Sequence, residues 1–290
     1  MERQVVVGFD GSPMSLDAVE WAAVQAVRRG ATLRIVACYD VRVESAMVPI
    51  AIGAFGSLAK SVEEGGTAAL RQVKARCPLL DAVLEVRAGP AASVLGRESR
   101  WADLLVVGAS ARRGAAAFWL GSTARSVARH CACPLVVVRG LAATGVTKRI
   151  IVGVDESPEA DAAVRWAAEE ADRSGATLVI VHCWWFAYRP VDLPSSQARE
   201  IQEIDAARLL DRAVEEAREQ CGSNVLGMLL EENPITALLA MAGPRDVLVL
   251  GSPSHGEILS SVLGSTVNGV LEESTVPVII VPSRKALDRA

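Results

Sequence analysis

The sequence predicts an α/β protein built from two doubly wound domains, each a five-stranded parallel sheet with helices on both faces. Three observations predict this fold class. Short apolar runs alternate with longer amphipathic stretches, the whole order occurs twice, and glycines and small polar residues follow the same runs in both halves. Strict alternation of strands and helices is typical of doubly wound sheets with right-handed crossovers.

The two halves of the 290-residue chain repeat one another. Val7–Leu33 matches Val152–Leu178, and Leu105–Val138 matches Leu248–Val281. The shared positions include glycines and polar residues: Gly8, Asp10, Ser12, Pro13, Gly108, Gly121, Ser122 and Thr123 recur as Gly153, Asp155, Ser157, Pro158, Gly251, Gly264, Ser265 and Thr266. Because a packing constraint alone would retain apolar positions, the retained polar residues indicate a function common to both halves.

Length and composition agree with a tandem duplication. A chain of 290 residues is long enough for two domains of the common size, about 100–150 residues each. Hydrophobic residues make up 51% of the chain, so each half can bury a core. The first domain is expected at residues 1–140 and the second at 148–290, because Gly140–Thr147 is a short Ala/Gly/Thr stretch without a core-forming pattern.

Each half contains five nearly continuous apolar runs, the pattern of parallel strands that are covered on both faces. The runs are Val5–Phe9, Leu33–Cys38, Ala82–Val86, Leu104–Val107 and Leu135–Val138, then Ile150–Val154, Leu178–Cys183, Val225–Leu230, Val247–Leu250 and Val278–Val281. Five strands per domain favour a flavodoxin-like sheet, although the runs do not give the order of the strands.

Amphipathic stretches between the runs predict the helices. Residues 16–26 carry apolar side chains at helical spacing, and Gly30 is a typical C-terminal stop. The longest apolar stripe covers residues 201–221 and follows Ser195–Ser196, which are typical N-cap residues. Trp21 and Trp166 occupy equivalent helix positions and are expected to pack in the core.

Bulk charge and hydropathy exclude several classes of protein. The net charge of −4 and the pI near 5.6 give no basic surface for nucleic acid. No run of ~18 apolar residues is present to span a membrane, and the charged Glu2 and Arg3 are unlike the start of a signal peptide. We therefore expect a cytoplasmic protein without nucleic-acid or membrane partners.

The six cysteines are expected to play structural roles. Cys38 and Cys183 stand at equivalent ends of apolar runs and are expected as small core residues. Cys131 and Cys133 form a C-x-C pair beside His130, but a metal would require two further ligands that the sequence does not supply nearby. No metal site is expected.

Two recurring segments follow the first and fourth strands of each half, where ligands bind in open α/β sheets. In the first half, the segment after the fourth strand leads into a helix that begins near Gly121–Ser122. The free N–H groups at the start of a helix favour binding of an anion. Asp10 and Asp155 have two interpretations. Either the carboxylate orients a ribose hydroxyl, a base edge or a metal on bound phosphates, or it caps the first helix together with Ser12 or Ser157.

On these residues the chain resembles the universal stress protein family over almost the whole of both halves. The resemblance implies an adenine nucleotide alpha hydrolase-like fold and ATP binding at a motif Gly-x2-Gly-x9-Gly-(Ser/Thr) after the fourth strand. The first half matches this motif at Gly108, Gly121 and Ser122, and the second half matches at Gly251, Gly264 and Ser265. Ala111 and Ser254 replace the second glycine.

The candidate nucleotide-binding residues combine this motif with the strand-one segment and the loop between them. They are Gly8, Asp10, Ser12, Gly108, Ala111, Arg112, Arg113, Gly114, Gly121, Ser122 and Thr123 in the first half, and Gly153, Asp155, Ser157, Gly251, Ser254, His255, Gly264, Ser265 and Thr266 in the second. Arg112 and Arg113 either contact phosphates or form a solvated loop. Glu257, in contrast, would repel a triphosphate. The first half is therefore expected to bind ATP more tightly.

The expected function is that of an ATP-binding regulator in the stress response, which acts as a homodimer and without catalytic turnover. The Walker lysine motif is absent, and no Ser/His/Asp arrangement recurs. Two alternatives stay open. Ala111 and Ser254 favour a dimerising scaffold that has lost nucleotide, and Mg²⁺ held by Asp10 would allow a slow ATPase.

Aromatic residues after the second strand of the second half are also candidates. Trp184, Trp185 and Phe186 are expected to line the base pocket or an interface. The neighbouring His182 is expected to be a core residue.

Overall fold

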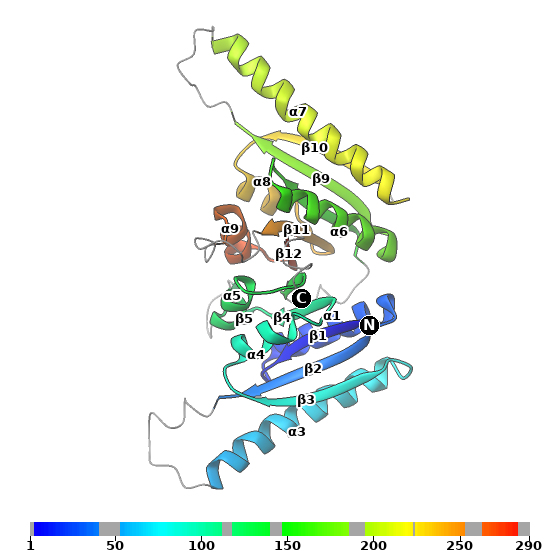
Figure 1. The fold of residues 1–290 in the computed structure, drawn as a ribbon, viewed down its shortest axis with the longest axis vertical. Helices are drawn as coiled ribbons and strands as arrows, with labels where there is room; N and C mark the ends of the chain where they lie inside the picture. The colour runs from blue at the N-terminus through cyan, green and yellow to red at the C-terminus, as the bar shows by residue number, and fades with distance from the viewer. Residues whose placement is uncertain are drawn as a thin grey trace. The chain divides into compact units, whose positions relative to one another are not determined.

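The computed structural model describes residues 3–40, 53–111, 118–139, 147–185, 195–222, 224–252 and 263–283. The chain divides into two compact units. The first holds the described residues up to 139, and the second holds those from 147 onward (Figure 1).

The first unit is a parallel sheet of five strands (Figure 1). They are β1 (Gln4–Phe9), β2 (Thr32–Tyr39), β3 (Ala82–Ala88), β4 (Leu104–Gly108) and β7 (Leu135–Val138). The order across the sheet is β7-β4-β1-β2-β3. β1 is central, because Val5 pairs with Leu33 of β2 on one side and with Leu104 of β4 on the other.

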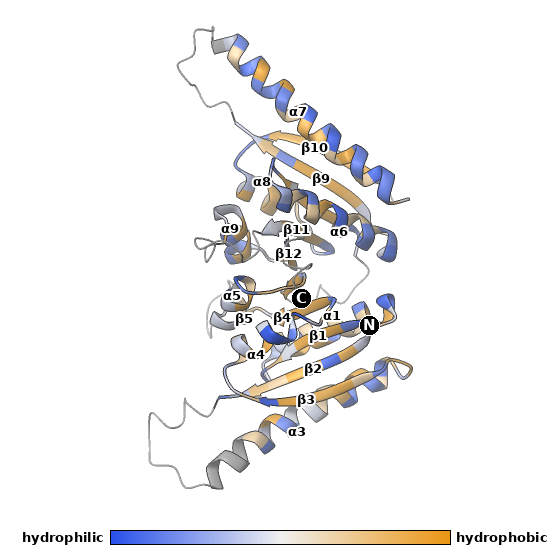
Figure 2. Ribbon diagram, viewed as in Figure 1, coloured by the Kyte–Doolittle hydropathy of each residue, from blue (hydrophilic) through white to orange (hydrophobic). Residues whose placement is uncertain are grey.

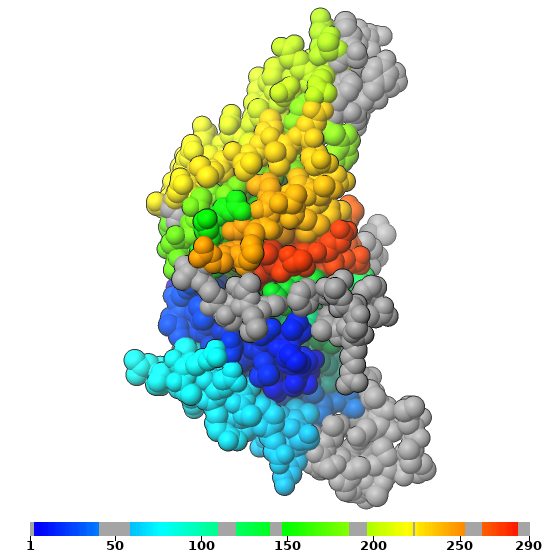
Figure 3. Space-filling view, turned by 180° about the vertical axis from the view of Figure 1, so that it is seen from behind, coloured from blue at the N-terminus to red at the C-terminus, as the bar shows by residue number. Residues whose placement is uncertain are grey.

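Four helices cover this sheet in two layers. They are α1 (Pro13–Arg29), α3 (Gly53–Arg76), α4 (Ala91–Glu98) and α5 (Ser122–Ala128). The chain moves outward from β1 through β2 to β3 and then returns to β4 and β7, so right-handed crossovers place α1 and α3 on one face and α4 and α5 on the other. Figure 3 shows α1 and α3 side by side on the first face.

The second unit repeats this topology. Its strands are β8 (Arg149–Val154), β9 (Thr177–Trp184), β10 (Val225–Glu231), β11 (Asp246–Ser252) and β12 (Val278–Pro282). Its helices are α6 (Pro158–Ser174), α7 (Ser195–Gln220), α8 (Pro234–Met241) and α9 (Ser265–Glu273). The strand order is β12-β11-β8-β9-β10, again fully parallel.

The predicted fold class is confirmed, and all ten apolar runs are strands that extend at most two residues beyond the predicted ends. Hydrophobic residues concentrate along the strands, whereas α7 is mixed in polarity (Figure 2). Trp21 is 5% exposed, as expected for a core residue, whereas the equivalent Trp166 is only half-buried. A short antiparallel hairpin, β5 (Ser110–Ala111) with β6 (Phe118–Trp119), was not predicted, because two-residue strands have no hydrophobic periodicity of their own.

Local signals fixed the ends of the first helix in each unit. Ser12 caps α1 by accepting a hydrogen bond from the Ser15 amide at 3.1 Å, and Ser157 caps α6 by accepting from the Ala160 amide at 3.2 Å. Gly30 ends α1 in the left-handed region at φ 57°, a conformation that favours glycine. Both serines therefore cap their helices, whereas the Asp10 and Asp155 carboxylates accept hydrogen bonds from the serine amides.

A largely buried charge network joins two strands and a helix of the first unit. Arg34 on β2 donates to Glu85 on β3 at 2.7 and 2.8 Å, and lies 2.8 Å from Glu98 at the end of α4. The hydrogen bond from Arg34 lowers the pKa of Glu85. A carboxyl whose pKa is lower in the folded than in the unfolded chain stabilises the fold above its ordinary pKa of 4.5, and that contribution is lost as the pH falls below this value.

We expect Arg34→Met to lower the free energy of unfolding at pH 7 by about 2–3 kcal/mol, because Glu85 and Glu98 then lose their buried cation and keep only the more exposed Arg87. Urea unfolding at pH 7 and pH 3.5 measures the effect, which should shrink at the lower pH as Glu85 becomes protonated. Arg208→Met is the matched control, since Arg208 and Asp205 form an exposed pair and its loss should cost at most about 0.5 kcal/mol. Equal effects of the two variants at pH 7 would contradict this account.

Candidate functional site

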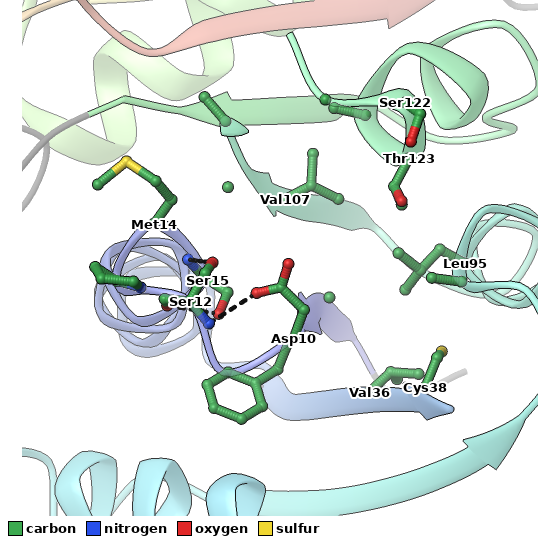
Figure 4. A pocket seen from close by; sticks show the side chains of 18 residues that line it. Asp10, Ser12, Met14, Ser15, Val36, Cys38, Leu95, Val107, Ser122 and Thr123 are labelled. Carbon is green, nitrogen blue, oxygen red and sulfur yellow. Dashed lines mark hydrogen bonds between the residues drawn. The ribbon is translucent and has the colours of Figure 1, made fainter. Parts of the chain in front are cut away.

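A cavity of about 620 Å³ lies at the carboxyl ends of β1 and β4 in the first unit (Figure 4). The sheet order reverses between these two strands, since β1 leads outward to β2 and β3 while β4 leads to β7. The crevice at such a reversal is where open α/β sheets bind ligands. The lining includes both recurring segments of the sequence: Gly8, Asp10, Ser12, Gly108, Gly121, Ser122 and Thr123.

Asp10 and Ser12 build the turn between β1 and α1. The Ser12 amide donates to Asp10 Oδ1 at 2.9 Å, and the other carboxylate oxygen points away from this bond (Figure 4). Partial burial opposes ionisation of Asp10, but hydrogen bonds from the Ser12 side chain and amide outweigh burial and lower the pKa of Asp10. Asp10 therefore supplies a fixed carboxylate at the cavity while Ser12 caps the helix.

Gly108 has a packing role that its place in the motif did not reveal. A Cβ at this position would lie 2.5 Å from the Met14 carbonyl oxygen and 2.9 Å from the Ser15 amide. The first turn of α1 thus rests directly on the end of β4. Recurrence of this glycine is explained by helix-to-strand packing even without a ligand.

The start of α5 forms the opposite wall of the first cavity. Gly121 is the N-cap residue, and no side chain in the described part of the chain caps this helix. Ser122 and Thr123 follow in the first turn and line the cavity. Their hydroxyls and the first-turn N–H groups are hydrogen-bond donors for an anionic group.

The second unit has a matching cavity of about 440 Å³, lined by Gly153, Asp155, Ser157, Gly251, Gly264, Ser265 and Thr266 among others. The turn is the same, because the Ser157 amide donates to Asp155 Oδ1 at 3.0 Å and the Ser157 hydroxyl donates to the same oxygen. The close approach also recurs, since a Cβ on Gly251 would lie 2.4 Å from the Glu159 carbonyl oxygen.

The two cavities differ in charge. Met14 lines the first, whereas Glu159 occupies the equivalent position and lines the second. Trp185 also lines the second cavity. Sequence reasoning missed Glu159, although its alignment with Met14 in the repeat was visible, because nothing in the sequence showed that this first-turn residue borders the cavity.

The sequence of this chain fits a single family in both halves. The sequence model of the universal stress protein family matches residues 1–139 and 147–282. The chain belongs to the universal stress protein family.

Relatives match the tandem chain over its length. A universal stress protein of Mycobacterium tuberculosis is 28% identical to it, and the alignment covers 96% of this chain and 97% of the relative. A universal stress protein of Mycolicibacterium smegmatis is also 28% identical, and that alignment covers 98% of both chains. The crystal structure of a universal stress protein from Archaeoglobus fulgidus has a TM-score of 0.72 and 18% identity, and covers 97% of this chain and 98% of that one. This likeness supports the fold.

Two cysteines of this universal stress protein lie elsewhere than expected. Cys38 and Cys183 are half-buried and line the first and second cavities, so the prediction of core residues was wrong. Both follow the apolar part of their strands, where the strand end opens onto the cavity. Burial raises the pKa of each thiol to about 11.

A further hollow of about 530 Å³ adjoins the second cavity and shares Asp155, Ser157 and Trp185 with it. His182 is half-buried and lines this hollow rather than packing in the core. Its Nδ1 lies 2.8 Å from the Val154 carbonyl oxygen. Trp184 lines the hollow too, with the Arg199 guanidinium 5.6 Å from its ring centroid.

Several predicted residues lie outside the described part of the chain: Arg112, Arg113, Gly114, Phe186, Ser254, His255 and Glu257. Ala111 is described only in its backbone, as the end of β5. Within the residues that the structure describes, no group of three or more His, Cys, Asp or Glu side chains is arranged to hold a metal ion. Likewise, none of the described helices is long and apolar enough to cross a membrane.

Proposed function

We propose that this universal stress protein binds ATP in the first cavity and acts as a nucleotide-dependent regulator of the stress response. The observation that carries the proposal is the position of the cavity at the reversal of strand order, where the recurring segments of β1 and β4 meet. Its volume of about 620 Å³ falls within the range of about 300–1,000 Å³ typical of small-molecule sites.

The lining suits the separate parts of a nucleotide. Val36, Leu95 and Val107 offer apolar surface for a base. Asp10 offers an acceptor for a ribose hydroxyl, whereas Ser122 and Thr123 at the start of α5 offer donors for phosphate oxygens. The donors and the fixed carboxylate lie on opposite walls, so the phosphates and the ribose can occupy different sides of the cavity.

We further propose that the site binds ATP without turnover. Among the described residues that line the first cavity, Asp10 and Cys38 are the titratable side chains, and neither is a cation that would neutralise charge on a transferred phosphoryl group. The chain also lacks the Walker lysine motif. A scaffold that has lost nucleotide is the second candidate, and Ala111 and Ser254 at motif glycines favour it.

The test is to denature the purified chain and identify released small molecules by mass spectrometry, followed by calorimetric titration of the stripped chain. We expect ATP to be recovered and to rebind with a Kd of about 1–100 µM, without phosphate release above the uncatalysed rate. GTP is the control ligand and should bind more weakly. Absence of ATP binding in both assays would favour the scaffold, and steady phosphate release would favour the slow ATPase.

A further inference from the structure

The loop between α5 and β7 brings two thiols together. Cys131 and Cys133 are separated by one residue, and their Sγ atoms lie 3.9 Å apart. Both are free thiols. Cys131 is half-buried, whereas Cys133 is 1% exposed. The pair therefore has an outer and an inner member.

The end of α4 holds this turn. The Ser99 hydroxyl donates to the Gly96 carbonyl oxygen at 2.8 Å and accepts from the Ala132 amide at 3.0 Å. Ser99 is itself 1% exposed. Because the residue between the two cysteines is anchored, the backbone of this turn is held in place.

The same turn in the second unit shows that the fold does not require thiols there. Ser274 and Val276 occupy the equivalent positions before Pro277. The Ser274 hydroxyl donates to the Val276 carbonyl oxygen at 2.8 Å and accepts from the Val276 amide at 3.1 Å. A single hydroxyl closes the turn in one unit, so two cysteines in the other call for a chemical explanation.

The two thiols differ in pKa, so one of them is the better nucleophile for the first step of disulfide formation. The hydrogen bond from the Cys133 thiol lowers the pKa of Cys131, while burial raises the pKa of Cys133 well above its ordinary value. The thiolate is the attacking species in disulfide exchange. The half-buried Cys131 therefore reacts before the buried Cys133, which is placed to resolve the product.

We propose that Cys131 and Cys133 form a reversible intrachain disulfide, which makes this turn a redox-responsive modification site for small disulfides of low-molecular-weight thiols. The Cys131 thiolate attacks one sulfur of the small disulfide RSSR, which forms a Cys131–S–SR bond and releases RS⁻. The Cys133 thiolate then attacks Cys131 Sγ and releases the second RS⁻. The two protons lost by the cysteines end on the released thiolates, so two cysteines are oxidised and one disulfide is reduced to two thiols.

The movement required is small. A disulfide bond is about 2.05 Å long, so the sulfurs must approach by roughly 2 Å from their separation of 3.9 Å. We expect rotation of the two side chains to supply this displacement.

The test treats the reduced full-length chain with oxidised glutathione, blocks free thiols by alkylation and analyses tryptic peptides by mass spectrometry. Cleavage after Arg129 and Arg139 yields a peptide of residues 130–139, in which Cys131 and Cys133 are the only cysteines. We expect this peptide to lose about 2 Da and both alkylation sites. Cys133→Ser should instead stop at a glutathione adduct on Cys131, and Cys131→Ser should leave Cys133 unmodified until the chain is unfolded.

Cys38 and Cys183 are internal controls, because their raised thiol pKa values should make them react at least about tenfold more slowly than Cys131. Two free thiols in peptide 130–139 after treatment, a stable adduct on Cys131 in the unmodified chain, or a disulfide between chains would each overturn the proposal. Reduction of the oxidised peptide by excess thiol completes the test, since failure to reverse would contradict a responsive site.

Discussion

Gly108→Ala is expected to lower the free energy of unfolding by about 3 kcal/mol. The added Cβ would lie 2.5 Å from the Met14 carbonyl oxygen and 2.6 Å from its carbon, and these are backbone atoms in the first turn of α1. The turn cannot yield as a flexible side chain would, because Ser12 and Asp10 hold it by hydrogen bonds. The helix must therefore shift away from β4, which also disturbs the first cavity.

Gly96→Ala is the matched control in the same unit. Gly96 lies within α4, and a Cβ there meets no atom within 4 Å. The same chemical change should therefore stabilise the fold by about 0.5–1 kcal/mol through helix propensity. Urea unfolding of both variants tests whether the two substitutions change the free energy of unfolding in opposite directions. A Gly108→Ala variant as stable as Gly96→Ala would show that the recurring glycine serves the ligand alone.

Gly121→Glu is expected to weaken ATP binding by about 100-fold, the effect of a carboxylate a few ångströms from a triphosphate. This expectation rests on the proposed ATP site. The fold should tolerate the change, because Gly121 has a negative φ of −60° and an acidic residue at a helix start interacts favourably with the dipole. Gly121→Gln has the same size without the charge, so it separates repulsion from steric blocking.

Gly264→Glu in the second unit is expected to change the measured affinity less than about threefold, because we expect that cavity to be the weaker ATP site. Glu159 lines it already and opposes a triphosphate, where Met14 lines the first cavity. Calorimetric titration of the stripped variants ranks the sites. Equal losses from the two glutamate substitutions, or a loss confined to Gly264→Glu, would reverse the ranking.

The sequence alone predicted the features of the fold that depend on residues close together in the chain. Continuous apolar runs predicted the strands, because helices cover both faces of each sheet. This pattern is the same whichever helix packs on a given face. Ser12 and Gly30 marked the ends of α1 because capping needs only a neighbouring hydroxyl and a left-handed residue. The duplication strengthened these predictions, since the equivalent residues Ser157 and Gly175 cap α6 in the second unit.

The repeat and its motif residues also predicted the position of the candidate site. Gly8, Asp10, Gly121 and Ser122 do line one cavity, because the carboxyl ends of parallel strands meet at one edge of the sheet. What the sequence by itself determined about this protein is therefore its family, its two α/β units and the segments that surround each cavity.

The tertiary structure decided which contacts these residues make. Strand order, the second role of Gly108, the carboxylate of Glu159 beside its cavity and the 3.9 Å approach of Cys131 and Cys133 all depend on distances across elements. A sequence pattern reports the periodicity within one element, and the spacing of glycines or cysteines is compatible with many tertiary arrangements. Only packing selects one of them, because it fixes which backbone lies against which side chain.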